Sequence, residues 1–350
     1  MRALTVRPGE AASGRLEMVP APSPDDGAVL VRTLAVGICG TDVEILRGEF
    51  GSSPPNRDRL ILGHESIGRV EEAPAGCGLD PGDLVVGIVR RPDPVPCRYC
   101  AVEEWDMCSN GQYTERGIKS LDGYCSEYFR IEPEFAVRVE PSLGLLGVLL
   151  EPTSIVAKAW DHVDRIGSRS RAWAPETVLV TGAGPIGLLA ALIGAERGLQ
   201  LHVLDRVTEG PKPRLVKDLG GTYHAGRLPD AADFTPDIIM ECTGAATVVF
   251  DAISRNAPSG IVCLAGISSG EHRVDVDIDA LNRTMVMEND AVFGSVNANR
   301  SHYEMAAEVL SRADRGWLSG LISRHVPIAD WSRAFDRQPD DVKVIIDFTL

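Results

Sequence analysis

The spacing of apolar and polar positions changes near the middle of the chain, at about Glu176. Up to about Ala172, apolar segments are short, often alternate with polar residues and are interrupted by Gly and Pro, a pattern typical of β-strands joined by turns. We expect strands at Val29–Gly37, Asp83–Val89 and Cys125–Val137. This pattern predicts an irregular, β-rich first portion.

From Glu176 onward, segments with the pattern of strands alternate with segments that have the pattern of helices. Strands are expected at Thr177–Thr181, Leu201–Asp205, Asp237–Glu241 and Gly260–Ala265, and helices at Pro185–Arg197, Lys212–Leu219 and Thr247–Arg255. This alternation indicates a parallel sheet covered by helices on both faces. After Asn297 come a helical pattern at Tyr303–Ala313, then Trp317–Arg337, and a last strand at Lys343–Phe348. We expect that last strand to rejoin the first portion.

A glycine-rich turn follows the first strand of the alternating region and opens its first helix. The turn consists of Gly182, Ala183, Gly184, Pro185, Ile186 and Gly187. Its three glycines permit a sharp turn, close approach of the backbone to a pyrophosphate, and tight packing of helix on strand. Free N–H groups at the helix start would bind the phosphates. We therefore expect this turn to bind a dinucleotide, although tight turns in any α/β protein also use glycine.

An acidic residue, Asp205, ends the next expected strand, about 20 residues beyond the turn. Its carboxylate would accept hydrogen bonds from both ribose hydroxyls and repel a 2′-phosphate. Arg206 follows directly, and its guanidinium would pair with a 2′-phosphate, stack on adenine, or remain a solvated loop charge. Together, Asp205 and Arg206 favour NAD over NADP as the cofactor, without excluding NADP.

Four residues from three separate segments form a donor set suited to a catalytic zinc: Cys39, His64, Glu65 and Glu151. Zinc accepts thiolate, imidazole and carboxylate, and a catalytic site keeps one position open for water or substrate. We expect Cys39, His64 and Glu151 as ligands, with Glu65 as an exchangeable ligand or as the carboxylate that orients the site. The structural alternative is a buried cysteine, a core histidine paired with the adjacent acid, and a glutamate at a helix start. Their joint occurrence beside a nucleotide turn favours zinc.

Composition places the chain among soluble globular proteins. It has 350 residues, 44% of them hydrophobic, and a formal net charge of -15, which argues against nucleic acid or an anionic membrane as a partner. The first residues lack a signal-peptide pattern, and no apolar stretch reaches the roughly 20 residues that span a bilayer, so we expect a cytoplasmic protein.

The chain contains eight cysteines. In a cytoplasmic protein they are better explained as metal ligands, nucleophiles or buried residues than as disulfides. A buried or incidental role fits Cys77, Cys125, Cys242 and Cys263.

Several motifs carry a resemblance to one superfamily. In Cys39-Gly40-Thr41-Asp42 and Gly63-His64-Glu65 the chain resembles the zinc-dependent medium-chain dehydrogenases. Glu151-Pro152-Thr153 matches their polyol and sugar branch, where a glutamate replaces a cysteine ligand. Further matches to the glucose (aldose) 1-dehydrogenases occur at Val89–Pro92, Tyr113–Ile118, Gly294–Asn297 and Asp341–Lys343. The resemblance covers nearly the whole chain.

The resemblance implies an α/β protein with two domains. It implies a GroES-like, β-rich catalytic domain over residues 1–152, a Rossmann domain with a doubly wound parallel sheet over 153–296, and a C-terminal return to the catalytic domain over 297–350. Related enzymes form dimers or tetramers, so the resemblance also implies a homodimer or homotetramer.

The resemblance further assigns roles to residues near the zinc. In that family Thr41 sits by the substrate oxygen and helps to relay its proton. Residues matching Glu115, Glu151 and Asn297 line the sugar and nicotinamide region. The structural alternatives are a helix cap for Thr41, a loop charge for Glu115 and a turn residue for Asn297.

One motif departs from the superfamily pattern. In the superfamily, the lobe that holds a structural zinc has the motif Cys-x2-Cys-x2-Cys-x7-Cys. In this chain, Cys97, Cys100 and Cys108 occupy the last three positions of that motif. The first position is Pro94, which cannot bind metal, while the adjacent Asp93 can supply an oxygen. A zinc held by three cysteines and one aspartate and an empty lobe with reduced thiols both remain open.

These features together predict a zinc-dependent NAD(P) oxidoreductase that oxidises the anomeric hydroxyl of an aldose such as glucose to the lactone. One alternative keeps the chemistry but acts on a cyclitol, an amino sugar or another secondary polyol. An alternative of another class is a catalytically inactive, nucleotide-binding redox sensor, which predicts damaged metal ligands. A methyltransferase also uses a Gly-rich turn and a following acid, but it does not account for the zinc residues.

Overall fold

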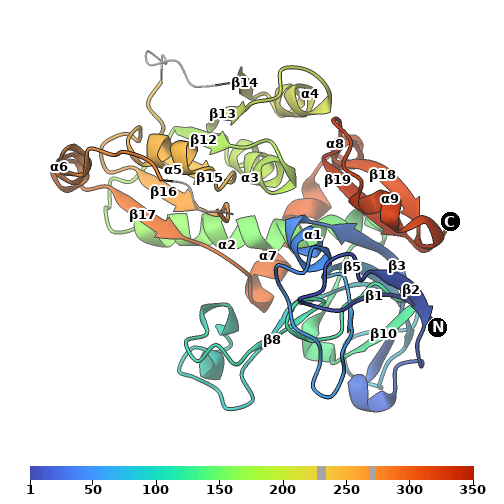
Figure 1. Ribbon diagram of the computed structural model, residues 1–350. Coiled ribbons are helices and arrows are strands. Elements are labelled where there is room, and N and C mark those ends of the chain that lie inside the picture. The colour runs from blue at the N-terminus through green and yellow to red at the C-terminus, as the bar shows by residue number, and fades with distance from the viewer. Residues whose placement is uncertain (227–233, 269–272) are drawn as a thin grey trace. The chain divides into compact units, whose positions relative to one another are not determined.

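The computed structural model describes residues 1–226, 234–268 and 273–350. The chain forms two compact units: Met1–Ser154 with Asn297–Leu350 make unit 1, and Ile155–Val296 make unit 2. In Figure 1, unit 1 takes the blue-to-green and the red ends of the colour scale. Unit 1 contains all four expected zinc donors, and unit 2 contains the glycine turn.

The largest sheet of unit 1 has seven strands in the order β11-β6-β5-β3-β19-β18, with β10 also paired to β3. Its strands are β3 (Val29–Ile38), β5 (Glu65–Glu72), β6 (Leu84–Gly87), β10 (Tyr128–Ile131), β11 (Ala136–Arg138), β18 (Ile322–Pro327) and β19 (Lys343–Asp347). A second sheet, β2-β1-β4, consists of β1 (Arg2–Val6), β2 (Arg15–Met18) and β4 (Leu60–Ile61). A third, β7-β8-β9, consists of β7 (Arg90–Arg91), β8 (Thr114–Arg116) and β9 (Ser120–Leu121).

The helices of unit 1 are mostly short. The α-helices are α1 (Gly40–Leu46), α7 (Arg300–Arg312), α8 (Arg315–Leu321) and α9 (Ser332–Phe335), and α2 (Leu150–Gly167) begins in unit 1 and continues into unit 2. The 3-10 helices are η1 (Pro24–Asp26), η2 (Cys100–Val102), η3 (Trp105–Met107), η4 (Pro133–Phe135), η5 (Pro141–Leu149) and η6 (Ile328–Asp330).

The central strand β3 positions the expected zinc site. It pairs antiparallel with β5 on one side, where Gly37 lies opposite Glu65, and with β19 on the other, where Gly37 lies opposite Ile345. Because β19 comes from the C-terminal segment and pairs with β3, the two ends of the chain meet in one sheet. The end of β3 leads directly through Cys39 into α1.

Unit 2 contains a six-stranded sheet in the order β14-β13-β12-β15-β16-β17, and every pair is parallel. Its strands are β12 (Thr177–Thr181), β13 (Gln200–Asp205), β14 (Thr222–Ala225), β15 (Ile238–Glu241), β16 (Ile261–Leu264) and β17 (Ala291–Gly294). Its further helices are α3 (Pro185–Glu196), α4 (Pro211–Asp218), α5 (Ala246–Ile253) and α6 (Ile278–Glu288), and Figure 1 shows α3 and α5 beside the sheet. The strand order is that of a dinucleotide-binding Rossmann fold, which confirms the predicted sheet.

Two segments differ from the expected elements. Leu150–Gly167, which the Gly and Pro spacing assigned to the irregular β-rich portion, is the helix α2. The segment Trp317–Arg337, expected to follow the helical pattern, contains strand β18, because pairing with β19 determines its conformation. The sequence patterns also missed β14, α6 and β17 of unit 2.

The expectation that the chain has no apolar stretch long enough to span a bilayer was wrong on length and composition. Among the described residues, one helical stretch, Pro141–Gly167, is long and apolar enough. However, 72% of its 18-residue apolar window is buried within the protein, which is typical of a core helix.

Candidate active site

Cys39, His64 and Glu65 converge at one point of unit 1. Cys39 lies between β3 and α1, and His64 directly precedes β5, which begins at Glu65. The Cys39 Sγ atom lies 3.1 Å from His64 Nε2, and the donor atoms of all three residues lie within 4.8 Å of one another. This spacing suits coordination of a single cation.

Asp42 holds two of these residues in place. One carboxylate oxygen, Oδ2, accepts a hydrogen bond from the Cys39 backbone N–H at 2.9 Å, and Oδ1 lies 3.3 Å from His64 Nδ1. The side chain of Asp42 is fully buried. A carboxylate facing the far nitrogen of a metal-binding histidine orients its ring. In the sequence, Asp42 stands out only as part of the Cys39-Gly40-Thr41-Asp42 motif, and its role was not predicted. Its position three residues after Cys39, in a capping pattern, was the available signal.

Glu65 is ion-paired to a residue that sequence reasoning missed, Lys343. The Lys343 Nζ atom lies 2.6 Å from Glu65 Oε1 and 2.5 Å from Oε2, and both side chains are buried. Lys343 begins β19, so the Glu65 carboxylate crosses β3 to reach it. It crosses at Gly37, where a Cβ atom would clash with Glu65 Oε2. A side chain at this position of β3 would therefore displace the carboxylate.

Glu151 lies at the second position of α2 and is buried. It lies outside the compact trio but within electrostatic reach of it. Burial is the main cause that raises the pKa of Glu151 to about 7; the charge of Glu65 acts in the same direction, and those of His64 and Lys343 act against it. The structure thus brings all four predicted zinc donors into one buried region.

The charges of this region fit a divalent cation. The carboxylates of Asp42, Glu65 and Glu151 are all buried, and Lys343 supplies a positive charge to them. Burial opposes the charge of the His64 ring, but Cys39 and Asp42 outweigh it and raise the pKa of His64 well above its ordinary value. Buried carboxylates are costly unless paired, and thiolate, imidazole and carboxylate are the donors that zinc accepts. The residues therefore fit a zinc ion.

Thr41 lies beside this site, at the second position of α1. It is half-buried, and within the described residues its hydroxyl makes no hydrogen bond to the protein. Cys39, rather than Thr41, is the N-cap residue of α1, which removes the helix-cap alternative for Thr41. The hydroxyl is thus available to a ligand.

Glu115 and Asn297, which are 182 residues apart, are hydrogen-bonded to each other. The Asn297 Nδ2 atom donates to Glu115 Oε1 at 2.8 Å, and Asn297 adopts a left-handed backbone conformation with φ of 61°. Arg90 donates to the same oxygen from Nε at 3.0 Å and pairs with it through Nη2 at 2.9 Å. Glu115 is buried, and within the described residues its second oxygen, Oε2, has no hydrogen-bond partner. In the sequence, Arg90 stands out only as part of the Val89–Pro92 match, and its role was not predicted.

In unit 2, the glycine turn has the geometry that its sequence predicted. Gly182 has φ of 90°, and a Cβ atom on Gly187 would overlap the Gly182 carbonyl oxygen. Gly184 is the N-cap of α3 and makes no side-chain cap, and a Cβ atom there would meet no atom within 4 Å. Pro185 and Ile186 form the first turn of α3. The helix start thus presents N–H groups to open space, as phosphate binding requires.

Asp205 lies at the end of β13 and holds this turn. Its Oδ2 atom accepts a hydrogen bond from Ala183 N–H at 2.7 Å and from Lys212 Nζ at 3.3 Å, and its Oδ1 atom accepts from Val207 N–H at 3.1 Å. Burial acts to raise the pKa of Asp205, but these hydrogen bonds and the Lys212 charge outweigh it and lower the pKa. Arg206 is exposed directly beside it. Lys212 therefore offsets much of the negative charge on which a preference for NAD would rest.

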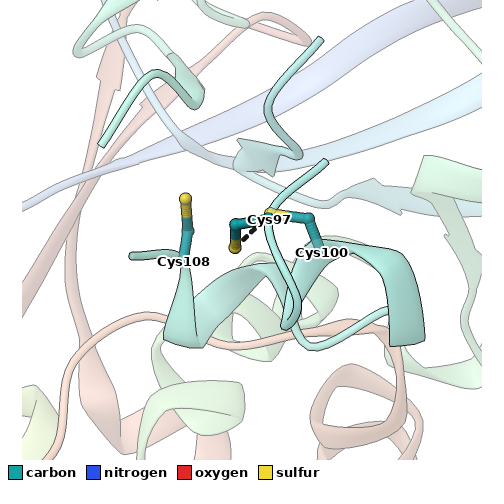
Figure 2. A group of neighbouring side chains, drawn as sticks. All are labelled: Cys97, Cys100 and Cys108. Atoms are coloured by element: carbon teal, nitrogen blue, oxygen red, sulfur yellow. Dashed lines mark hydrogen bonds between the residues drawn. The ribbon is translucent and has the colours of Figure 1, made fainter. Parts of the chain in front are cut away.

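The cysteine lobe, residues 93–108, gathers the three thiols of its motif, as Figure 2 shows. The sulfurs of Cys97, Cys100 and Cys108 lie within 4.8 Å of one another, and those of Cys97 and Cys100 are 3.7 Å apart. Backbone N–H groups, first that of Cys100 and then that of Ser109, lower the pKa of the Cys97 thiol to about 6. N–H groups that point at a sulfur favour the thiolate that a metal binds.

Asp93 also belongs to this lobe. Its backbone N–H group is directed at the Cys100 sulfur, which places the residue beside the thiols. The side chain is 3% exposed, and neither carboxylate oxygen has a hydrogen-bond partner among the residues that the structure describes. A buried carboxylate without a partner is costly, and a metal ion would satisfy it. The four residues fit a second zinc.

All eight cysteines lie among the described residues, and each is a free thiol there. Cys125 and Cys263 are buried, and burial raises the pKa of both thiols, that of Cys263 to about 12. Cys77 and Cys242 are partly buried. These four cysteines fit the buried or incidental role.

Comparison with known proteins identifies two families along the chain. Residues 25–141 match the alcohol dehydrogenase GroES-like domain, and residues 144–348 match the glucose dehydrogenase C-terminus. The second match alone spans more than half of the chain. The two families agree with the β-rich part and the Rossmann part that the sequence predicted, and they confirm the fold class.

Individual relatives match along nearly their full length. A glucose 1-dehydrogenase of Methanocella arvoryzae is 40% identical, with 99% of both chains covered, and glucose 1-dehydrogenase 2 of Vulcanisaeta moutnovskia is 37% identical, also with 99% of both covered. The structure is similar to that of Haloferax mediterranei glucose dehydrogenase in complex with NADP, Zn and gluconolactone, with 34% identity, a TM-score of 0.91 and 100% of both chains covered. The chain therefore belongs to the zinc-dependent medium-chain dehydrogenases, in their glucose 1-dehydrogenase branch.

Proposed function

We propose that this chain is a zinc- and NAD(P)-dependent dehydrogenase that oxidises the anomeric hydroxyl of an aldose such as glucose to the lactone. The observation that carries the proposal is the convergence of the half-buried Cys39 with the buried side chains of His64, Glu65 and Glu151 in unit 1. The Haloferax mediterranei relative, whose complex contains NADP, Zn and gluconolactone, supports the substrate class and both cofactors.

Cys39, His64 and Glu151 hold the catalytic zinc in this proposal. Glu65 is held by Lys343, so it acts as an exchangeable ligand or as the carboxylate that orients the site. When bound, the zinc supplies a Lewis acid for the sugar hydroxyl, and the dinucleotide supplies an acceptor for the hydride from the adjacent carbon. The half-buried Thr41 hydroxyl, which has no other hydrogen bond within the described residues, relays the proton of the reacting hydroxyl.

Glu115 and Asn297 bind the sugar in this proposal. Three donor atoms, Nε and Nη2 of Arg90 and Nδ2 of Asn297, converge on Glu115 Oε1. This leaves Oε2 to accept a hydrogen bond from a sugar hydroxyl. A fixed carboxylate that reads a hydroxyl discriminates strongly against substrates that lack it.

The glycine turn and Asp205 hold the dinucleotide, and the residues accept either NADP or NAD. In this proposal Asp205 would bind the ribose of NAD, and Asn297 is assigned to the nicotinamide by the resemblance to the family. Arg206, which is exposed, and the Lys212 charge beside Asp205 together make a 2′-phosphate acceptable. The complex of the Haloferax mediterranei relative with NADP is consistent with this acceptance.

Cys97, Cys100, Cys108 and Asp93 hold a second, structural zinc in this proposal. The unpartnered carboxylate of Asp93 takes the place of the fourth cysteine of the superfamily pattern. Metal content of the purified protein tests it: more than one zinc per chain is expected, and Asp93→Ala should lose the second zinc while keeping the first.

We also propose domain limits and an assembly. The catalytic domain comprises residues 1–152 and 297–350 and the nucleotide-binding domain residues 153–296, close to the two compact units. The assembly is a homodimer or homotetramer. It is supported by α6, which has no buried residue and exposes Ile278, Val286 and Met287, and by β17, an edge strand of the sheet. Figure 1 shows α6 beside β16 and β17.

A cytoplasmic location completes the proposal. Eight free cysteines in one chain are typical of a reducing compartment.

Sedimentation of the wild type and of a Val286→Glu variant tests the proposed homo-oligomer, because a charge at an apolar contact should shift the protein toward the monomer.

A panel of sugars tests the activity. Purified protein is assayed with glucose, galactose and a set of cyclitols, separately with NADP and with NAD, and nucleotide reduction is followed together with zinc content. Oxidation of glucose or galactose is expected. Oxidation of cyclitols alone would assign a polyol substrate, and binding of dinucleotide without turnover on any substrate would assign the inactive sensor.

A further inference from the structure

We infer that Asp106 of the cysteine lobe is a positioning residue for sugar binding, because it anchors both partners of the Glu115 carboxylate. This inference rests on the proposed role of Glu115. It assigns to the lobe a task beyond holding a metal, namely setting the affinity for the sugar. All of the residues involved belong to unit 1.

The first anchor runs through Arg90. Its guanidinium binds Glu115 Oε1 through Nε and Nη2, and its remaining nitrogen, Nη1, donates to the backbone carbonyl of Asp106 at 3.2 Å. The same guanidinium lies 3.7 Å from the ring centroid of Tyr113. Arg90 is buried, and its planar guanidinium makes all of these contacts at once. A shift of the Asp106 backbone would therefore move the Glu115 carboxylate.

The second anchor runs through the loop before α7. Asn299 donates from Nδ2 to Asp106 Oδ1 at 2.9 Å, and both side chains are buried. Two residues earlier in the same loop, Asn297 donates to Glu115 Oε1. The left-handed backbone of Asn297 and the hydrogen bond from Ala298 N–H to Asn297 Oδ1 fix its amide relative to Asn299. Asp106 therefore holds the loop that holds Glu115.

The lobe in turn holds Asp106. It lies in η3, which connects η2 and Cys100 to Cys108, so the thiols flank it in sequence. Trp105 on the same turn packs edge-on against Phe135, with ring centroids 5.5 Å apart. The position of Asp106 thus depends on how the lobe is folded, and the sugar carboxylate depends on Asp106.

Loss of this anchor has a defined kinetic signature. Glu115 contacts the sugar in the ground state and in the transition state alike, so its misplacement should raise KM and leave kcat nearly unchanged. Removal of one buried hydrogen bond predicts a rise in KM of about fivefold to tenfold. The content of catalytic zinc should not change.

Two variants break the second anchor, between Asp106 and Asn299, and two serve as controls. Asp106→Ala removes the acceptor of Asn299, whereas Asp106→Asn keeps an oxygen there and should restore most of the affinity. Asn299→Asp removes the donor but keeps the side-chain oxygen that caps α7 through Ser301 N–H. Asp314→Ala removes the cap of α8 at Trp317 N–H, which lowers stability without touching the Glu115 network.

KM and kcat for the sugar are measured for each variant, and hydrogen exchange of residues 114–121 is followed without sugar. In Asp106→Ala and Asn299→Asp we expect a higher KM for the sugar and faster hydrogen exchange of residues 114–121. In Asp314→Ala we expect the KM and the exchange rate to match those of the wild type. Unchanged KM and unchanged exchange in the first two variants would overturn it. If the wild type oxidises no aldose, the proposed function fails, and the exchange measurement still decides the inference.

Discussion

Lys343 and Glu65 lie on two strands that flank β3, and the ammonium of Lys343 contacts both oxygens of the Glu65 carboxylate, at 2.6 and 2.5 Å. The contact passes across β3 at Gly37, where no side chain intervenes. One buried ion pair thus joins the last strand of the chain to a candidate zinc donor. The C-terminal segment is therefore part of the site rather than a peripheral extension.

Lys343→Met should destabilise the protein, because it leaves the Glu65 carboxylate buried without its counter-charge. Both side chains are at most 3% exposed, and breaking a buried pair on one side costs about 3–5 kcal/mol. The free energy of unfolding by denaturant, measured at constant zinc, checks this. The double variant Lys343→Met with Glu65→Gln removes both charges and should recover much of the loss; equal stability of wild type and Lys343→Met would contradict the prediction.

Gly37→Ala should disrupt the catalytic metal site without affecting the nucleotide site. The new Cβ atom would clash with Glu65 Oε2, whereas a Cβ at Gly40, three residues on, would meet no atom of the described residues within 4 Å. Gly40→Ala is thus a matched control. Zinc content and dinucleotide affinity are measured for both variants. We expect Gly37→Ala to lose zinc and Gly40→Ala to keep it. Equal zinc retention in the two variants would contradict the assignment of Gly37 as the position where the Glu65 carboxylate crosses β3.

The sequence predicted much of the framework because local patterns carry it. The alternation of strand and helix after Glu176, the start of β3 at Val29 and the strand β12 depend on residues near in sequence, and the structure agrees with them. Strand β18 was missed because its conformation depends on pairing with β19 rather than on its own residues. A helix start at Glu151 was considered only as the alternative to a zinc ligand, and the extent of α2 was not predicted because Gly and Pro in the preceding turn obscured its helical spacing.

The candidate site divides in the same way. Cys39, His64 and Glu151 were predicted as zinc donors because their residue types fit one chemistry. The contacts of Glu65 and Glu115 were not predicted, since Lys343 meets Glu65 across 278 residues of chain and Asn297 meets Glu115 across 182. A lysine or arginine alone does not indicate which carboxylate it will pair with. Such pairings follow only from the register of strands that are distant in sequence.

Asp341 should make stability depend on acid pH. Burial acts to raise the pKa of this carboxyl, but hydrogen bonds from Arg324, at 2.8 and 2.7 Å, and from Gln338 N–H outweigh it and hold the pKa below its ordinary value. Because the folded pKa is lowered, the ionised group contributes stability above the unfolded pKa of about 4, and this contribution is lost as the pH falls through the folded pKa.

Asp341→Asn should therefore lower the free energy of unfolding at pH 7 by about 1 kcal/mol, and the difference from wild type should shrink below about pH 4. Denaturant unfolding across this pH range checks both statements. Asp330→Asn is the matched control, because Asp330 pairs with Arg333 at 3.8 Å on the exposed surface. A difference for Asp341→Asn that persists unchanged at pH 3 would refute the assignment.

The central claim is that Cys39, His64 and Glu151 hold a zinc that is required for oxidation of a sugar. Sugar-dependent reduction of NADP and NAD, measured with zinc content in the wild type, His64→Ala and Glu151→Ala, tests it most directly. The account predicts that both variants lose turnover by about a thousandfold or more while dinucleotide binding stays near that of the wild type. Retained turnover in either variant, or full activity in wild-type protein free of zinc, would contradict it.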